Sequence, residues 1–195
     1  MLDRAKALLD AGRTAEALAI TGPLADRDDA SHRALALHST ALKGLGRRQE
    51  ALNFDALATV KYASSGVAWH NLAATLDDLG RGRDAVRAAE RAQSLGQDGA
   101  LTWGVMARAR LAAGDLDGAE RAYGETLRRA PAREETAGEL ADLVWMRRGD
   151  LAAAQQVLDN AAHAGGAAPP LLLAKAKLYE AAGEAAQADA LLTRA

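Results

Sequence analysis

The fold is decided by a stretch in the middle of the chain that reads WHNLAATLDDLGRGRDAVRAAERA, residues 69–92. In its first half, apolar residues such as Leu72 and Leu76 recur at helical spacing. Gly80 separates the two halves, and a residue without a Cβ can adopt the strained backbone of a tight turn. Ala85 follows five residues later, and so small a side chain lets two helices cross at close range. The stretch therefore predicts two antiparallel helices joined by a short turn.

This glycine and alanine pair returns along the whole chain. The turn glycines are Gly12, Gly46, Gly80, Gly114, Gly149 and Gly183, in steps of 34, 34, 34, 35 and 34 residues. The alanines that follow after five residues are Ala17, Ala51, Ala85, Ala119, Ala154 and Ala188. A period of this length indicates an array of helical repeats, each of which touches only its neighbours.

Two of the units resemble the tetratricopeptide repeat. One reads Trp69-x-x-Leu72-Ala73-x-x-Leu76 and continues with Gly80, Ala85 and Ala92; the other reads Trp103-x-x-Met106-Ala107 and continues with Gly114, Ala119, Tyr123 and Pro131. The resemblance extends over six units, at residues 1–27, 32–62, 66–96, 100–131, 134–165 and 169–195. It implies an all-α, right-handed superhelix, or solenoid, of about six antiparallel helix pairs, with residues 1–195 forming one domain.

Two units depart from the pattern. In the fifth, Gly138 replaces the expected tryptophan and Asp142 replaces the usual small residue, so the register of this unit stays open. In the first, Pro23 falls inside the second helix. Proline removes a hydrogen bond and clashes with the preceding turn, so we expect this helix to kink or to end early.

The composition excludes several classes of protein. Hydrophobic residues make up 49% of the 195 residues and aromatic residues only 4%, which favours closely packed helices rich in Ala, Leu and Val. The 24 basic and 26 acidic residues give a net charge of -2, without the basic excess that nucleic-acid binding needs. The absence of cysteine excludes disulfides and thiolate ligands.

The sequence gives no sign of membrane insertion or export. No apolar run approaches the ~18 residues of a membrane span, and the N-terminus lacks the order of a signal peptide. We therefore expect a cytoplasmic protein with no membrane partner, and the Ala- and Arg-rich composition is typical of bacterial repeats of this kind.

No motif argues for catalysis. The spacing of Gly80, Gly82 and Ala85 fits a dinucleotide fingerprint, but that fingerprint requires a preceding strand. None of the histidines stands in a metal-binding motif, and the adjacent acids Asp77 and Asp78 point in different directions on a helix. We expect no catalytic residue, no metal site, no cofactor and no enzymatic activity.

The resemblance also implies a binding site. In this family the first helix of each pair lines a concave groove that holds peptides. By register, the peptide-binding residues are Arg33, Thr40, Val67, His70, Asn71, Leu101, Val105, Arg108 and Leu140. Family members that capture the acidic tails of heat-shock chaperones need a set of Lys, Asn and Arg residues, of which only Asn71 is present here. The function we expect is a scaffold or adaptor for another protein or peptide.

Two alternatives stay open. No later helix follows the last repeat in the sequence, so Ala188, Leu191 and Leu192 are expected to meet a partner, a second copy or another domain. If another domain covers them, the chain is the N-terminal, non-catalytic arm of a larger bacterial enzyme, of the sulfotransferase or the iron/2-oxoglutarate oxygenase type. The other alternative is RNA binding through the arginine stripe Arg83, Arg87 and Arg91, and its signature would be a steep salt dependence.

Overall fold

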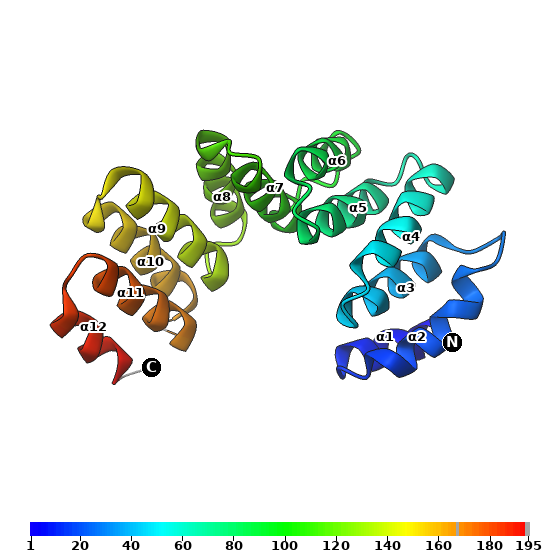
Figure 1. The fold of residues 1–195 in the computed structure, drawn as a ribbon, viewed down its shortest axis with the longest axis horizontal. Coiled ribbons are helices and arrows are strands. Elements are labelled where there is room, and N and C mark those ends of the chain that lie inside the picture. The colour runs from blue at the N-terminus through cyan, green and yellow to red at the C-terminus, as the bar shows by residue number, and fades with distance from the viewer. Residues whose placement is uncertain (167, 194–195) are drawn as a thin grey trace. The chain divides into compact units, whose positions relative to one another are not determined.

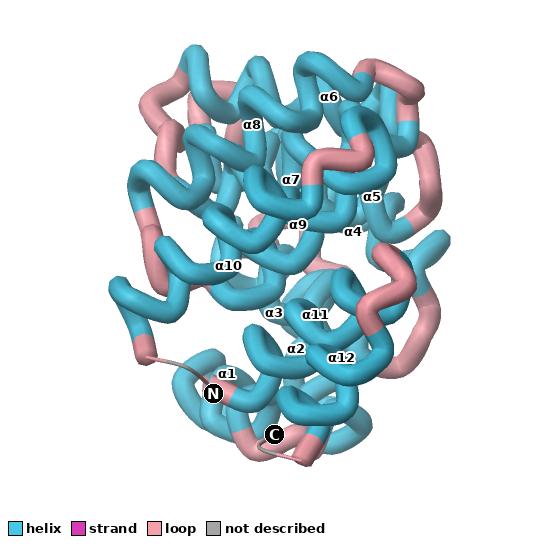
Figure 2. Tube along the Cα trace, turned by 90° about the vertical axis from the view of Figure 1, so that its left-hand side faces the viewer, coloured by secondary structure: helices cyan, strands magenta, loops and turns pink. Residues whose placement is uncertain are grey.

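The computed structural model describes residues 1–166 and 168–193, and within them it contains helices and no strand (Figures 1 and 2). The helices are α1 (Leu2–Asp10), α2 (Thr14–Ala25), α3 (His32–Gly44), α4 (Arg48–Lys61), α5 (Gly66–Asp78), α6 (Gly82–Ser94), α7 (Ala100–Ala112), α8 (Leu116–Arg129), α9 (Glu134–Arg148), α10 (Leu151–Gly165), α11 (Pro169–Ala181) and α12 (Ala185–Leu192). The expected all-α architecture of six helix pairs is confirmed.

These helices group into two compact units. The first contains Met1–Asp98 and Arg108–Ala113, and the second contains Gly99–Ala107 and Gly114–Ala195. Within each unit a helix packs against the next one along the chain, and the first helices of neighbouring pairs also touch, as α3 does with α5 and α9 with α11. Each unit therefore has a surface built from first helices side by side. The organisation of residues 1–195 as one domain stays a prediction.

The repeating glycines and alanines have the roles that their spacing predicts. All six turn glycines have positive φ, between 61° at Gly149 and 82° at Gly114, a region in which a residue with a Cβ is strained. The six alanines, from Ala17 to Ala188, are at most 1% exposed. At these alanines the two helices of a pair cross so closely that a larger side chain would push them apart.

Gly82 also has a packing role. A Cβ at this position would lie 2.6 Å from the carbonyl oxygen of Ala109 and 2.9 Å from the amide nitrogen of Ala113. The start of α6 therefore approaches the end of α7 too closely for any side chain. Since α5 precedes this turn, the nucleotide-like spacing of Gly80 and Gly82 reflects helix packing.

Pro23 shortens its helix without ending it at the proline. Helix α2 continues to Ala25 and has 12 residues, whereas α4 in the next pair has 14. The amide that proline lacks belongs to the last turn, where few later residues depend on the helix.

The fifth repeat follows the others from the start of its first helix. Ala141 is 1% exposed and stands 34 residues after the buried Ala107, whereas Asp142 is exposed. The expected small residue is thus Ala141. The extra residue of this repeat lies at the end of α9, which has 15 residues where α5 and α7 have 13.

Candidate functional site

In the first unit, six of the nine predicted binding residues lie on the first helices. They are Arg33 and Thr40 on α3, Val67, His70 and Asn71 on α5, and Arg108 at the end of α7. We call the outward side of these helices the α3–α5 face. Val67 is 44% exposed, while His70 and Asn71 are half-buried. An exposed apolar side chain beside half-buried polar side chains suits an extended peptide. Such a peptide is bound by apolar contacts of its side chains and by hydrogen bonds of its backbone.

Arg108 is held by an ion pair. Its Nε donates a hydrogen bond of 3.0 Å to Oδ2 of Asp77 on α5, whose side chain is only 9% exposed. Burial raises the pKa of Asp77, and the Arg108 guanidinium partly offsets this effect. The positive charge of Arg108 thus balances the negative charge of the buried Asp77 carboxylate. Any contact of Arg108 with a ligand would be additional to that structural role.

His70 has an environment that disfavours its charged form. Burial lowers the pKa of its imidazole, and the nearby positive charge of Lys43 lowers it further. The ring is therefore neutral at neutral pH, with one donor and one acceptor nitrogen.

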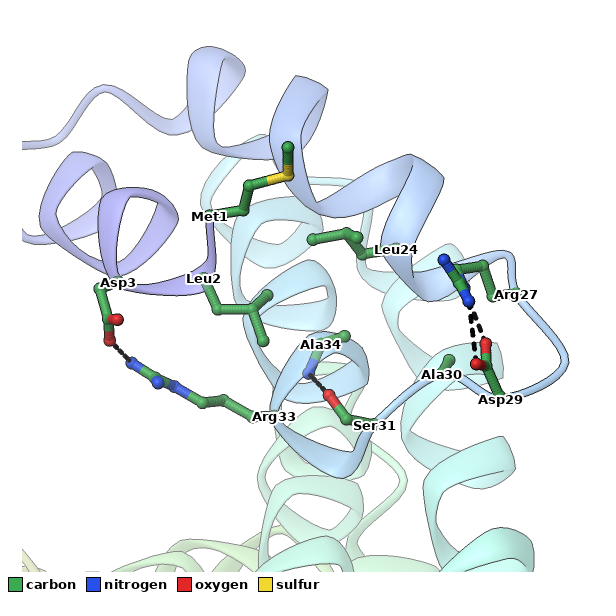
Figure 3. Close-up of a pocket in the computed structure, with 10 residues that line it drawn as sticks. All are labelled: Met1, Leu2, Asp3, Leu24, Arg27, Asp29, Ala30, Ser31, Arg33 and Ala34. Carbon is green, nitrogen blue, oxygen red and sulfur yellow. Dashed lines mark hydrogen bonds and ion pairs between the residues drawn. The ribbon is translucent and has the colours of Figure 1, made fainter.

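Arg33 and Thr40 make contacts within the protein. The guanidinium of Arg33 forms an ion pair with Asp3 on α1, and the hydroxyl of Thr40 donates a 2.9 Å hydrogen bond to the carbonyl oxygen of Ala36. Arg33 also lies on the rim of a cavity of about 480 Å³ between the first two pairs (Figure 3). Met1, Leu2 and Leu24 form its apolar wall, and on the rim Arg27 pairs with Asp29. The rim charges balance, so the cavity has no clear preference for a charged ligand.

The other three predicted residues, in the second unit, differ in exposure. Leu101 is 57% exposed and offers an apolar surface, but Val105 is only 5% exposed. Leu140 is 7% exposed and borders an open pocket of about 250 Å³ with Leu127 and Val157. Val105 and Leu140 therefore belong to the interior and have little surface for a ligand.

Sequence reasoning missed the residues that α9 does present. Glu135, Glu139, Asp142 and Met146 follow one another at helical spacing, and all but the half-buried Glu139 are exposed. Partial burial of the Asp142 carboxyl raises its pKa, and the positive charge of Lys177 on α11 partly offsets this rise. The 35-residue step was the available signal, because it indicated one extra residue between Gly114 and Gly149.

A buried carboxylate beneath the α3–α5 face was also missed. Asp55 on α4 is 1% exposed, and its Oδ2 accepts hydrogen bonds from the hydroxyls of Ser39 on α3, at 2.8 Å, and Thr75 on α5, at 2.6 Å. Burial raises the pKa of Asp55, and the Thr75 hydrogen bond and the nearby Lys43 act in the opposite direction. This carboxylate joins three helices that carry or support the face.

The last repeat offers a smaller apolar surface than its sequence suggests. Ala188 is buried and Leu191 half-buried, while Leu192 is 44% exposed. Self-association through these residues stays a prediction.

Within the described part of the chain, no group of three His, Asp or Glu side chains is placed to hold a metal ion. Nor does any described helix have the length and apolar character that crossing a membrane requires.

Comparisons with known proteins agree with this geometry. The family model for the tetratricopeptide repeat matches residues 1–21, 66–91 and 100–125. PilW, a widely conserved type IV pilus biogenesis factor, is 17% identical with a TM-score of 0.85, over 98% of this chain and 89% of PilW. PilF of Pseudomonas aeruginosa is 19% identical with a TM-score of 0.78, over 97% of this chain and 86% of PilF.

A tetratricopeptide repeat protein from Parabacteroides merdae is 16% identical with a TM-score of 0.79, over 99% of this chain and 75% of that protein. No curated protein matches the chain in sequence. At these identities the structural likeness shows the fold. Together with the glycine turns, the alanine crossings and the three matched segments, it shows that the chain has the tetratricopeptide-repeat fold.

Proposed function

We propose that the chain is a protein-interaction scaffold that binds a peptide segment of another protein on the α3–α5 face. The observation that carries the proposal is the composition of this face: Val67 is exposed, and His70 and Asn71 stand half-buried beside it. Half-buried polar groups on packed helices are already ordered, so binding a peptide loses little side-chain entropy. The structural likeness to PilF and PilW supports a scaffold fold, and neither their partners nor their processes are transferred to this chain.

The experiment is an affinity capture from a lysate of the source cells, with identification by mass spectrometry. The test variant combines Val67→Ser, His70→Ala and Asn71→Ala. Arg108 is left unchanged, because its loss would strand the buried carboxylate of Asp77. The matched control combines Arg83→Ala, Arg87→Ala and Arg91→Ala, three exposed residues of α6.

We expect a partner that the wild type and the α6 control retain and the α5 variant loses, with unchanged thermal unfolding of all three proteins. A partner retained by the α5 variant and lost by the α6 control would move the binding site to α6 and contradict the proposal. If the material lost by the α6 control were RNA, the RNA-binding alternative would replace the peptide-binding one.

A further inference from the structure

The junction between the first two helix pairs contains a buried histidine. His38 on α3 is 7% exposed, and its Nδ1 lies 3.0 Å from the hydroxyl oxygen of Thr21 on α2, which is fully buried. The corresponding positions of the next two repeats, 34 and 68 residues later, hold Leu72 and Met106. A titratable ring therefore stands at a packing position that these repeats fill with an apolar side chain.

Neighbouring helices enclose this ring on two sides. Phe54 on α4 meets it in a T-shaped arrangement, with the ring centroids 4.4 Å apart, and on α2 a Cβ at Gly22 would lie 3.8 Å from Cε1 of His38. The hydroxyl of Thr21 also lies 3.1 Å from the carbonyl oxygen of Ala17 on its own helix. With its hydrogen on Ala17, this hydroxyl accepts a hydrogen bond from Nδ1 of the neutral ring.

The charged groups around the ring do not compensate a positive charge on it. Asp26, after the end of α2, and Glu50 on α4 favour the charged form, whereas Arg47, before α4, opposes it. Neither acid forms an ion pair with His38 within the described residues, and Glu50 is paired with Arg47. Helix α1 meets α3 through the uncharged Leu8. Burial outweighs the two acids and lowers the pKa of His38, so the packed ring is neutral at neutral pH.

We propose that His38 is a pH-sensitive switch between the first two helix pairs: in mild acid the ring is protonated, and α1 and α2 detach from α3. Outside their own pair, α1 and α2 make most of their contacts with α3, so an opening of this helix contact releases the pair as a unit. Release shortens the folded array by one repeat. The inference concerns the coupling between repeats and does not rest on peptide binding at the α3–α5 face.

The direction of the effect follows from the two pKa values. A histidine in the released pair has the ordinary pKa of about 6.5, whereas the packed His38 has a lower one. As the pH falls below about 6.5, the released state binds a proton that the packed state does not bind, and the packed state loses stability. For one proton, the ratio of released to packed molecules rises by up to about tenfold per pH unit.

Hydrogen–deuterium exchange of the whole chain, measured by mass spectrometry at about pH 7.5 and about pH 5.5, tests the proposal. After correction for the intrinsic effect of pH on exchange, peptides from α1 and α2 should lose protection in acid. Peptides from α5 and α6 should keep theirs, because the switch releases only the first pair. By NMR, the Cε1 proton of His38 should titrate with a pKa below about 6.5.

Two variants remove the titrating group. His38→Asn keeps a polar group near the position of Nδ1, and His38→Leu introduces the apolar residue of the next repeat. Each should make the protection of α1 and α2 independent of pH over this range. If one variant loosens the pair at both pH values, the other provides the comparison. The control is His163→Asn, at an exposed position on α10, which should keep the acid effect of the wild type.

Several results would overturn the proposal. One is equal protection of α1 and α2 at the two pH values, and another is an acid effect that persists in both His38 variants. A third is an equal loss of protection in α5 and α6, because acid would then unfold the whole first unit. The lysate capture with the α5 variant tests a different surface, so a failure here leaves the proposed function standing.

Discussion

The carboxylate of Asp55 on α4 accepts a hydrogen bond of 2.6 Å from the hydroxyl of Thr75 on α5, and both residues are at most 1% exposed. The same oxygen accepts a second hydrogen bond from Ser39 on α3. A single acceptor thus connects helices of two successive repeats, in an interior made mostly of alanine and leucine.

The first prediction concerns this acceptor. Asp55→Ala should lower the free energy of unfolding by about 1–3 kcal/mol, because two buried hydroxyls lose their partner. Asp55→Asn should lower it less, since the amide oxygen can still accept. Urea denaturation measures both, with the exposed Asp189→Ala as a control expected to stay within about 0.5 kcal/mol of the wild type.

A second prediction concerns pH. Burial raises the pKa of Asp55 in the folded protein, so the folded state holds this proton to a higher pH than the unfolded chain does. Stability from this group is therefore greatest below the unfolded pKa and falls as pH rises to the folded pKa. Relative to Asp55→Asn, the wild type should lose stability as the pH rises above about 4, the ordinary pKa of an aspartate in the unfolded chain. A stability difference that is independent of pH would contradict this prediction.

The third prediction compares two glycines inside or at the start of a helix. Gly82→Ala should destabilise the protein by at least about 1–3 kcal/mol, because its Cβ would collide with the backbone of α7. Gly124→Ala on α8 meets nothing within 4 Å and should stabilise the protein by up to about 1 kcal/mol through helix propensity. Thermal unfolding distinguishes the two, and equal effects would show that the close approach at Gly82 is absent.

The fourth prediction tests the placement of Leu140. Leu140→Ala should cost about 2–5 kcal/mol of stability, since the side chain is 7% exposed and borders an open pocket. Leu101→Ala, at a 57% exposed position, should change stability by less than about 0.5 kcal/mol. If Leu140→Ala left stability unchanged and weakened a ligand, Leu140 would be a binding residue after all.

The fifth prediction concerns Arg147, which joins α9 to α8. Its guanidinium contacts Asp117 and Glu120 and is 24% exposed. Arg147→Ala should destabilise the protein by about 1–2 kcal/mol, less at high salt. Arg147→Lys should restore only part of this, because an ammonium group cannot contact both acids in a planar fork. Melting temperatures at two salt concentrations provide the comparison.

Much of the fold could be predicted because the repeated residues are those that the turn and the helix crossing require. A glycine with positive φ such as Gly80 and an alanine at a helix crossing such as Ala85 leave a period that no other residue type satisfies as well. The polar contacts of the interior leave no such period. The pair of Thr21 and His38, 3.0 Å apart, and the Asp55 network each occur in one place and could not be found by comparing units.

The binding residues were only partly predictable for a related reason. Register places Val67, His70 and Asn71 on a first helix, and their partial exposure agrees with that placement. Counting back from Gly149 selects Leu140, whose side chain is buried, because the extra residue follows it in the chain. Counting forward from the start of α9 gives Glu139 and Asp142 in its place.

The extra residue of α9 also shows where the array tolerates a change in length. The helix ends at Arg148, directly before the left-handed Gly149, whereas α5 ends at Asp78 and Leu79 separates it from Gly80. Beyond Gly149, Ala154 is again fully buried at its crossing. The junction between helix and turn thus absorbs an insertion without disturbing the packing of the following helix. Such junctions are the positions at which a repeat array of this kind can be lengthened, by natural variation or by design, while its interior stays in phase.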